Sequence, residues 1–432
     1  MGVVERPART LLSHLVDLRD DEHRAVWTSF GYFFFVLASY FILRPIRDEV
    51  AAATGVRNLP WLFAGTLAAT LVLNPLFAAL VVRFAPRRFI PYAYHFFALN
   101  LLGFYLLMRV ADQTPGSPSA MWTGRTFFVW TSVFNLFVVS IFWSFMADVF
   151  RSEQAKRLFG FIGVGGTLGS IAGSALTAAF ASRIGTINLL LVSAALLEIA
   201  TFFVARFPAS PGGPRSVSET APVGGSMWAG FSHLLQSPYL LMICLFLILY
   251  TVGSTFLYFQ QADIVGRFYE SRDARTTVLA RIELSVQILT IVTQVLLTGR
   301  VIRWIGLAAT LALLPGLSVV GFTTLGIAPV FATLAVFMVI RRSANFALTN
   351  PAMEILFTVV PREDKYKAKS FIETFVYRGG DQLGAWAYAG LAAIGLGSTG
   401  IAFAAVPLAV VWLLTGLWLG REHGRRTMGA TV

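Results

Sequence analysis

The sequence predicts an all-α membrane protein with twelve transmembrane helices in two pseudo-symmetric six-helix halves. Of its 432 residues, 56% are hydrophobic and only 13% are charged, about half the charged share of a soluble domain. The apolar residues form runs of roughly twenty, which is the length that a helix needs to cross a ~30 Å hydrocarbon core. A membrane β-barrel would instead show alternating strands of about ten residues.

The twelve predicted spans are the apolar runs between polar breaks. The first run lacks the short core and small-residue cleavage site of a signal peptide, so we expect an uncleaved anchor. The spans cover residues 26–43, 59–82, 89–109, 124–147, 158–181, 187–206, 239–260, 277–299, 305–325, 329–350, 370–393 and 398–419.

The basic residues between the spans predict the orientation. Lys and Arg are in a roughly two-to-one excess on the side that carries both ends of the chain, which predicts cytoplasmic termini. We expect a monomer in the inner membrane of a bacterium. The net charge of +12 then reflects topology, and no nucleic-acid partner is expected because the charge does not gather on one soluble face.

The chain divides into five expected parts, two of which repeat each other. A shift of about 214 residues aligns residues 142–170 with 356–385 and places Gly165-Gly166 over Gly379-Gly380. Repeated six-span bundles are typical of transporters whose site lies between the bundles near the membrane midplane. The parts are a cytoplasmic N-terminal segment 1–24, a bundle 25–206, a Pro/Gly/Ser-rich linker 207–238, a second bundle 239–419 and a cytoplasmic tail 420–432.

A first pair of arginines lies at the end of the first span. Arg44 and Arg47 share a helix face and can present two planar donors to one phosphate or carboxylate. Such charges are costly in a membrane unless they face water or a partner. The alternative is an interface cluster that Asp48 and Glu49 neutralise.

A second pair, Arg341 and Arg342, lies deep in the tenth span. Arg342, Asn345 and Thr349 recur at helical spacing and predict one polar stripe, with Pro351 expected to break the helix before Glu354. We favour a substrate-binding role for one of the two arginines over an internal ion pair.

Other polar residues in the spans have two open interpretations. Asp263, Glu354 and Glu373 could carry a coupling proton, but pairing with the span arginines is favoured. Gln260 is expected to orient the substrate, while Arg378 and Asp381 could neutralise each other. The expected coupling or ion-pair residues are Asp48, Asp263, Glu354, Glu373, Arg378 and Asp381.

Several chemistries find little support in the sequence. The single Cys244 and five scattered histidines argue against a metal site, and no nucleophile-base arrangement predicts an enzyme. No cofactor is expected. The glycines of residues 160–173 lack a dinucleotide-binding pattern and instead predict close helix packing.

Three segments together resemble a known family. They are YFILRPIRDEV, FWSFMADVFRSEQAKRLFGFIGVGGTLGS and RRSANFALTNPAMEILFTVVPREDKYKAKSFIETFVYRGG. The chain resembles the ATP:ADP antiporter (nucleotide transporter) family from about residue 26 to 395. The resemblance implies the major facilitator fold, nucleotide exchange by alternating access, and charged helix residues that contact phosphate or serve coupling.

The resemblance extends to particular residues and also has gaps. Arg47 stands where the family has a lysine before an aspartate, and Arg44, Glu354 and Arg378 match charged family positions. The fourth span lacks the family's acidic residue around residues 131–135. Gln260 or Gln261 lies near an expected glutamate, and Met353 replaces an expected lysine.

These observations predict a secondary transporter for an anionic, phosphorylated metabolite, with ATP/ADP-type exchange as the leading candidate. The expected partners are this small substrate and the lipid bilayer. A related carrier for a smaller anion is one alternative, and a proton-coupled symporter or drug exporter is another. The predicted substrate-binding residues are Arg44, Arg47, Arg341, Arg342, Asn345, Thr349 and Gln260.

Overall fold

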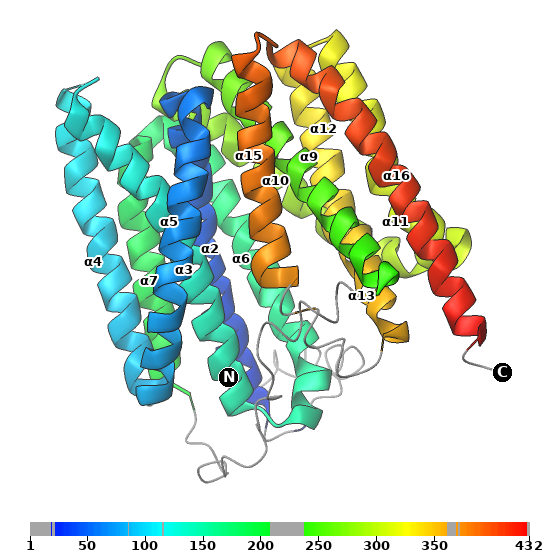
Figure 1. The fold of residues 1–432 in the computed structure, drawn as a ribbon. Coiled ribbons are helices and arrows are strands. Elements are labelled where there is room, and N and C mark those ends of the chain that lie inside the picture. The colour runs from blue at the N-terminus through cyan, green and yellow to red at the C-terminus, as the bar shows by residue number, and fades with distance from the viewer. Residues whose placement is uncertain are drawn as a thin grey trace. The chain divides into compact units, whose positions relative to one another are not determined.

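The computed structural model describes residues 19, 22–84, 86–114, 116–207, 237–360, 369 and 372–429, and their regular structure is entirely helical (Figure 1). The helices are α2 (His23–Thr54), α3 (Leu59–Arg83), α4 (Pro86–Gln113), α5 (Pro118–Val149), α6 (Ser152–Ile184), α7 (Leu189–Ala205), α9 (Pro238–Phe268), α10 (Arg272–Leu296), α11 (Thr298–Ile327), α12 (Phe331–Ala344), α13 (Asn350–Leu356), α15 (Tyr377–Ala393) and α16 (Ser398–Gly429).

Eleven helical segments among the described residues are long and apolar enough to cross a membrane, with α12 and α13 counted as one. Helix α15, preceded by a π turn at Ile372–Val376, occupies the remaining predicted span. Each of the twelve apolar runs therefore corresponds to a helix, and the predicted all-α membrane fold is confirmed. The last helix runs on to Gly429, into the expected tail.

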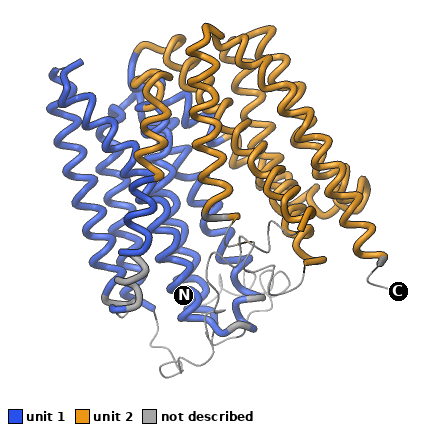
Figure 2. The backbone as a smooth tube through the Cα atoms, in the orientation of Figure 1, with its two compact units in different colours: residues 1–50, 68–215, 271–284 blue, residues 51–67, 216–270, 285–432 orange. Residues whose placement is uncertain are grey.

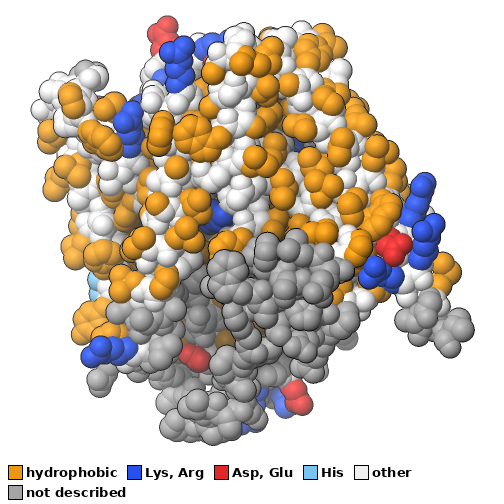
Figure 3. All heavy atoms as spheres, viewed as in Figure 1, with side chains coloured by type: hydrophobic (Ala, Val, Ile, Leu, Met, Phe, Trp, Pro, Cys, Tyr) orange, Lys and Arg blue, Asp and Glu red, His pale blue; other side chains and the backbone are white. Residues whose placement is uncertain are grey.

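The helices expose large apolar side chains, as membrane-spanning helices do. Trp61, Tyr92 and Trp304 are each at least two-thirds exposed, and in Figure 3 hydrophobic side chains are spread over the described part of the visible face. Water would make such a surface prone to aggregation, whereas lipid solvates it. The protein is an integral membrane protein.

The chain forms two compact units, coloured separately in Figure 2. Unit 1 comprises Met1–Val50, Ala68–Arg215 and Ser271–Leu284, and unit 2 comprises Ala51–Leu67, Ser216–Glu270 and Ser285–Val432. The first residues of α10 thus group with the N-terminal helices. The division at the linker stays a prediction, because residues 208–236 and most of 1–24 lie outside the described residues.

Small residues bring equivalent helices together in each unit. In unit 1, a Cβ atom at Gly169 or Gly173 would lie 2.2 or 2.3 Å from a backbone oxygen of α2, so α6 packs directly on α2. In unit 2, a Cβ atom at Gly380 or Gly384 would collide with Thr251 or Thr255 of α9. The glycines therefore serve packing, and the same pair of helices contacts in both repeats.

The tenth span contains a π turn and is not ended by its proline. Residues Asn345–Thr349 form one π turn between α12 and α13, and Pro351 lies in the first turn of α13. Proline has no N–H for the carbonyl of Ala347, which accepts a hydrogen bond from the Thr298 hydroxyl at 2.7 Å. The expectation that Pro351 breaks the helix is wrong.

Candidate functional site

Arg44 of α2 forms an ion pair inside unit 1. Its Nη1 lies 3.4 Å from Oε1 of Glu283 on α10, and the Glu283 side chain is only 3% exposed. The Arg44 Nε is buried and has no hydrogen-bond partner among the described residues. The guanidinium group thus has a donor that the surrounding protein does not satisfy, which is unusual for a buried polar atom.

Arg47 and the two acidic residues after it have different partners. Arg47 donates to Asp48 at 3.0 Å and to the Ser132 hydroxyl at 3.4 Å. Glu49, 2% exposed, instead accepts from Arg275 of α10 at 2.7 Å. The expected local neutralisation therefore holds for Arg47 and Asp48, while Glu49 ties α2 to the start of α10.

Arg341 is the buried arginine of the tenth span, with 3% of its surface exposed. Its Nε donates to the Ser318 hydroxyl at 3.0 Å, and both terminal nitrogens donate to Ser254 at 3.1 Å. It also donates to the Tyr250 carbonyl at 3.3 Å and lies 5.7 Å from the Trp412 ring centroid. None of the ion pairs among the described residues includes Arg341.

Only some of the residues predicted to lie beside Arg341 share its contacts. Asn345 donates to the Tyr250 hydroxyl at 2.9 Å, so it shares Tyr250 with Arg341. Thr349 is buried, and its hydroxyl has no hydrogen-bond partner within the part of the chain that the structure describes. Arg342 is half-buried. Because the π turn adds a residue to the turn, the predicted stripe through Arg342, Asn345 and Thr349 is not a regular helical stripe.

The remaining polar candidates with described contacts are bound to partners other than the span arginines. Gln260 is buried and donates to the Ser398 carbonyl at 3.2 Å. Asp263 pairs with Arg267 one helical turn on. Glu354 pairs with Lys369, 2.7 and 2.9 Å from its two oxygens. The favoured expectation that these carboxylates neutralise Arg341, Arg342 or Arg378 is not what the structure shows.

Three of the predicted candidates lie on the eleventh span. Arg378 and Asp381 lie half-buried on α15. The Glu373 side chain lies outside the described residues. Within those residues, no cluster of three His, Cys, Asp or Glu side chains could hold a metal ion.

Several residues of these sites were not predicted from the sequence. Glu283 and Arg275 face α2 from the opposite half of the chain, and no spacing rule links them to Arg44 or Glu49. Tyr250 and Ser254 look like ordinary residues of an apolar span. A weak signal exists for Glu283, because it is the one carboxylate within the predicted eighth span.

Both clusters place guanidinium groups within membrane-spanning helices, with Arg341 buried and Arg44 and Arg47 half-buried, an arrangement typical of transport pathways. The fold defines the class of protein: the chain is similar to solved major facilitator transporters. It matches a nucleoside transporter, NupG, with TM-score 0.58 and 13% identity over 94% of this chain and 98% of that one. It matches a D-xylose-proton symporter with TM-score 0.62 and 14% identity over 92% and 96%.

The sequence comparisons point to particular relatives. ADP,ATP carrier protein 1 of Chlamydia muridarum is 22% identical, covering 96% of this chain and 92% of the relative. ADP,ATP carrier protein 1 of Chlamydia pneumoniae is 23% identical, over 96% and 93%. No protein-family profile matches the chain. The predicted resemblance to ATP:ADP antiporters is confirmed, and the chain has the fold of the major facilitator transporters that it matches.

Proposed function

We propose that the protein exchanges phosphorylated anions of the ATP/ADP type across the inner membrane of a bacterium, with both termini in the cytoplasm. The observation that carries the proposal is Arg341. A cation buried in low dielectric without a carboxylate is costly even when its hydrogen bonds are made. An anionic substrate supplies the missing charge during transport.

Arg44 supports the same conclusion from unit 1. Its Nε is unsatisfied by the described residues, and its ion pair with Glu283 is 3.4 Å long, longer than a charge-assisted hydrogen bond of about 2.8 Å. A phosphate oxygen would satisfy this donor. Arg47, already bound to Asp48, adds positive charge beside it.

Alternating access with exchange requires that the loaded carrier crosses more readily than the empty one. With no anion bound, uncompensated guanidinium charge opposes the desolvation that accompanies closure of a carrier around its site. A bound polyphosphate removes this penalty. The two arginine clusters thus favour exchange over net transport.

A counterflow assay tests the proposal. Liposomes that contain the purified protein and are loaded with ATP are expected to accumulate labelled ADP with no ion or proton gradient. Unloaded liposomes serve as the control. Uptake that needs a pH gradient and ignores internal ATP would instead support a proton-coupled symporter.

A further inference from the structure

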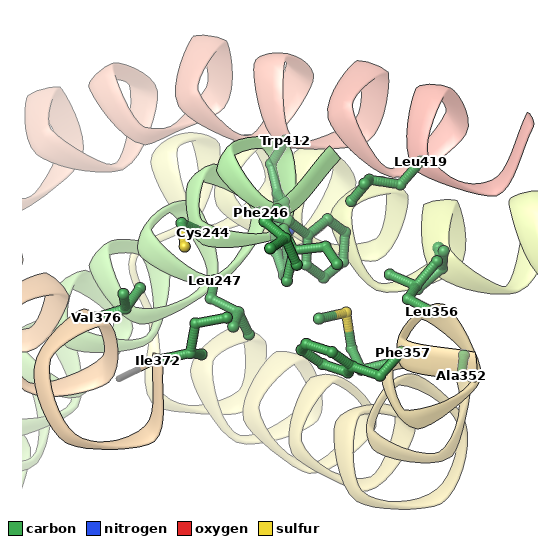
Figure 4. Packing of buried hydrophobic residues seen from close by; sticks show 14 of the residues in the cluster. Cys244, Phe246, Leu247, Ala352, Leu356, Phe357, Ile372, Val376, Trp412 and Leu419 are labelled. Atoms are coloured by element: carbon green, nitrogen blue, oxygen red, sulfur yellow. The ribbon is translucent and has the colours of Figure 1, made fainter. Parts of the chain in front are cut away.

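A cavity of about 420 Å³ lies within unit 2, between α9, α13 and the start of α15. Its size is in the range of small-molecule sites. Phe346, Phe357 and Tyr377 supply aromatic surface, and Leu247 and Ile372 add aliphatic surface. In Figure 4, Leu247 and Ile372 lie side by side and Phe357 faces them.

The charges at this cavity do not suit a phosphate. Lys369 is the single cation among its described lining residues, and both oxygens of Glu354 hold it within 2.9 Å. Asn350, an uncharged polar residue, belongs to the same lining. A flat, uncharged ring with a hydrogen-bonding edge fits this chemistry better than a polyanion or an acyl chain.

Two π turns border the cavity. The turn Asn345–Thr349 carries Phe346 and leads into Asn350, and the turn Ile372–Val376 carries Ile372 and leads into Tyr377. Such turns are rare, cost regular hydrogen bonding and occur frequently at functional sites. Two of them at one cavity indicate that its shape serves a ligand.

A chain of side-chain contacts links the lining of the cavity to the buried cation. Tyr377 packs edge-on against Tyr250, with ring centroids 6.3 Å apart, and Tyr250 accepts from Arg341 and from Asn345. One aromatic residue therefore separates the apolar cavity from the positive charge. A nucleotide has the same order of parts, an aromatic base followed by a charged phosphate chain.

We infer that this cavity is the subsite for the aromatic base of the transported molecule, an inference that rests on the proposed function. The rings of Phe346 and Tyr377 stack on the base, and Asn350 bonds its edge. Base stacking on an aromatic side chain contributes about five- to hundredfold in affinity.

The test compares binding of ATP and of tripolyphosphate, which lacks a base, to the purified full-length protein. We expect Phe346→Leu and Tyr377→Leu each to weaken ATP binding about fivefold or more and to leave tripolyphosphate binding unchanged. Phe268→Leu, an exposed phenylalanine at the end of α9, is the matched control. Size-exclusion profiles and unfolding temperatures confirm folding.

Other outcomes separate the two proposals. Unchanged ATP binding in both folded variants overturns the base subsite while leaving exchange intact. Equal loss of ATP and tripolyphosphate binding also overturns it, because the cavity would then act on phosphate or on the fold. A wild-type protein that binds neither compound overturns the proposed function, and the base subsite with it.

Discussion

Variants of Arg44 and Glu283 distinguish two roles of Arg44, a structural ion pair and a substrate-binding group. Arg44→Met leaves Glu283 buried without this cation and is expected to destabilise the protein by about 3 kcal/mol. The double variant Arg44→Met/Glu283→Leu should recover most of this loss, measured as the unfolding temperature in detergent. Exchange should stay lost in both. A double variant that exchanges ATP and ADP at the wild-type rate would reduce Arg44 to a structural role.

Glu22, just before α2, predicts a pH dependence. Burial alone would raise the pKa of its carboxyl group, but hydrogen bonds from Gln154, the Arg19 backbone and Arg157 outweigh it and hold the pKa below its usual 4.5. The ionised carboxylate therefore stabilises the fold above pH ~4.5, and this contribution is lost as pH falls through the lowered pKa.

Glu22→Gln tests this dependence. We expect the variant to unfold at a lower temperature than wild type at pH 7, with the difference shrinking as the pH is lowered below 4.5. Thermal unfolding of both proteins across this range is the measurement. A difference that stays constant down to pH 3 would show that the charge of Glu22 does not contribute.

Helix α6 shows how one element depends on small residues. Gly169→Ala would push a methyl group into the Phe34 carbonyl of α2, and overpacking of this kind costs about 1–3 kcal/mol. Gly163 has open space around its Cβ position, so Gly163→Ala should be neutral or slightly stabilising. Unfolding temperatures of the pair check this. Equal effects would mean that α6 does not pack on α2 as described.

The ion pairs between α2 and the start of α10 provide a second test of a contact between helices. Glu49→Gln removes the buried carboxylate that Arg275 and Arg272 share and should cost about 3 kcal/mol, because the mostly buried Arg275 loses this negative partner. Glu422→Gln breaks an exposed pair with Arg426 and should cost less than about 1 kcal/mol. Similar losses would argue that the α2–α10 contact is weak.

The fold could be predicted from the sequence because each membrane span is recognisable from its own apolar composition. Twenty apolar residues must form a helix in lipid, whatever surrounds them. The partners of the charged residues were not accessible in this way. Arg44 and Glu283 meet only after distant segments pack, and the π turn at Asn345–Thr349 shifts which residues face Tyr250.

The candidate functional residues could likewise be predicted from the sequence only in part. The unusual feature of Arg341, an arginine inside an apolar run, is visible in the sequence. Its lack of a carboxylate emerges only from the contacts of unit 2. The same contacts show that Arg341, rather than Arg342 of the predicted polar stripe, is the buried cation.

The central claim is that Arg341, a buried cation in unit 2, binds an anionic substrate. The most direct measurement is the ATP affinity of the wild type, Arg341→Met and the exposed control Arg426→Gln, with folding of each verified. We predict ATP binding at least about tenfold weaker for Arg341→Met and unchanged for Arg426→Gln. Equal ATP affinity in wild type and folded Arg341→Met would contradict the account.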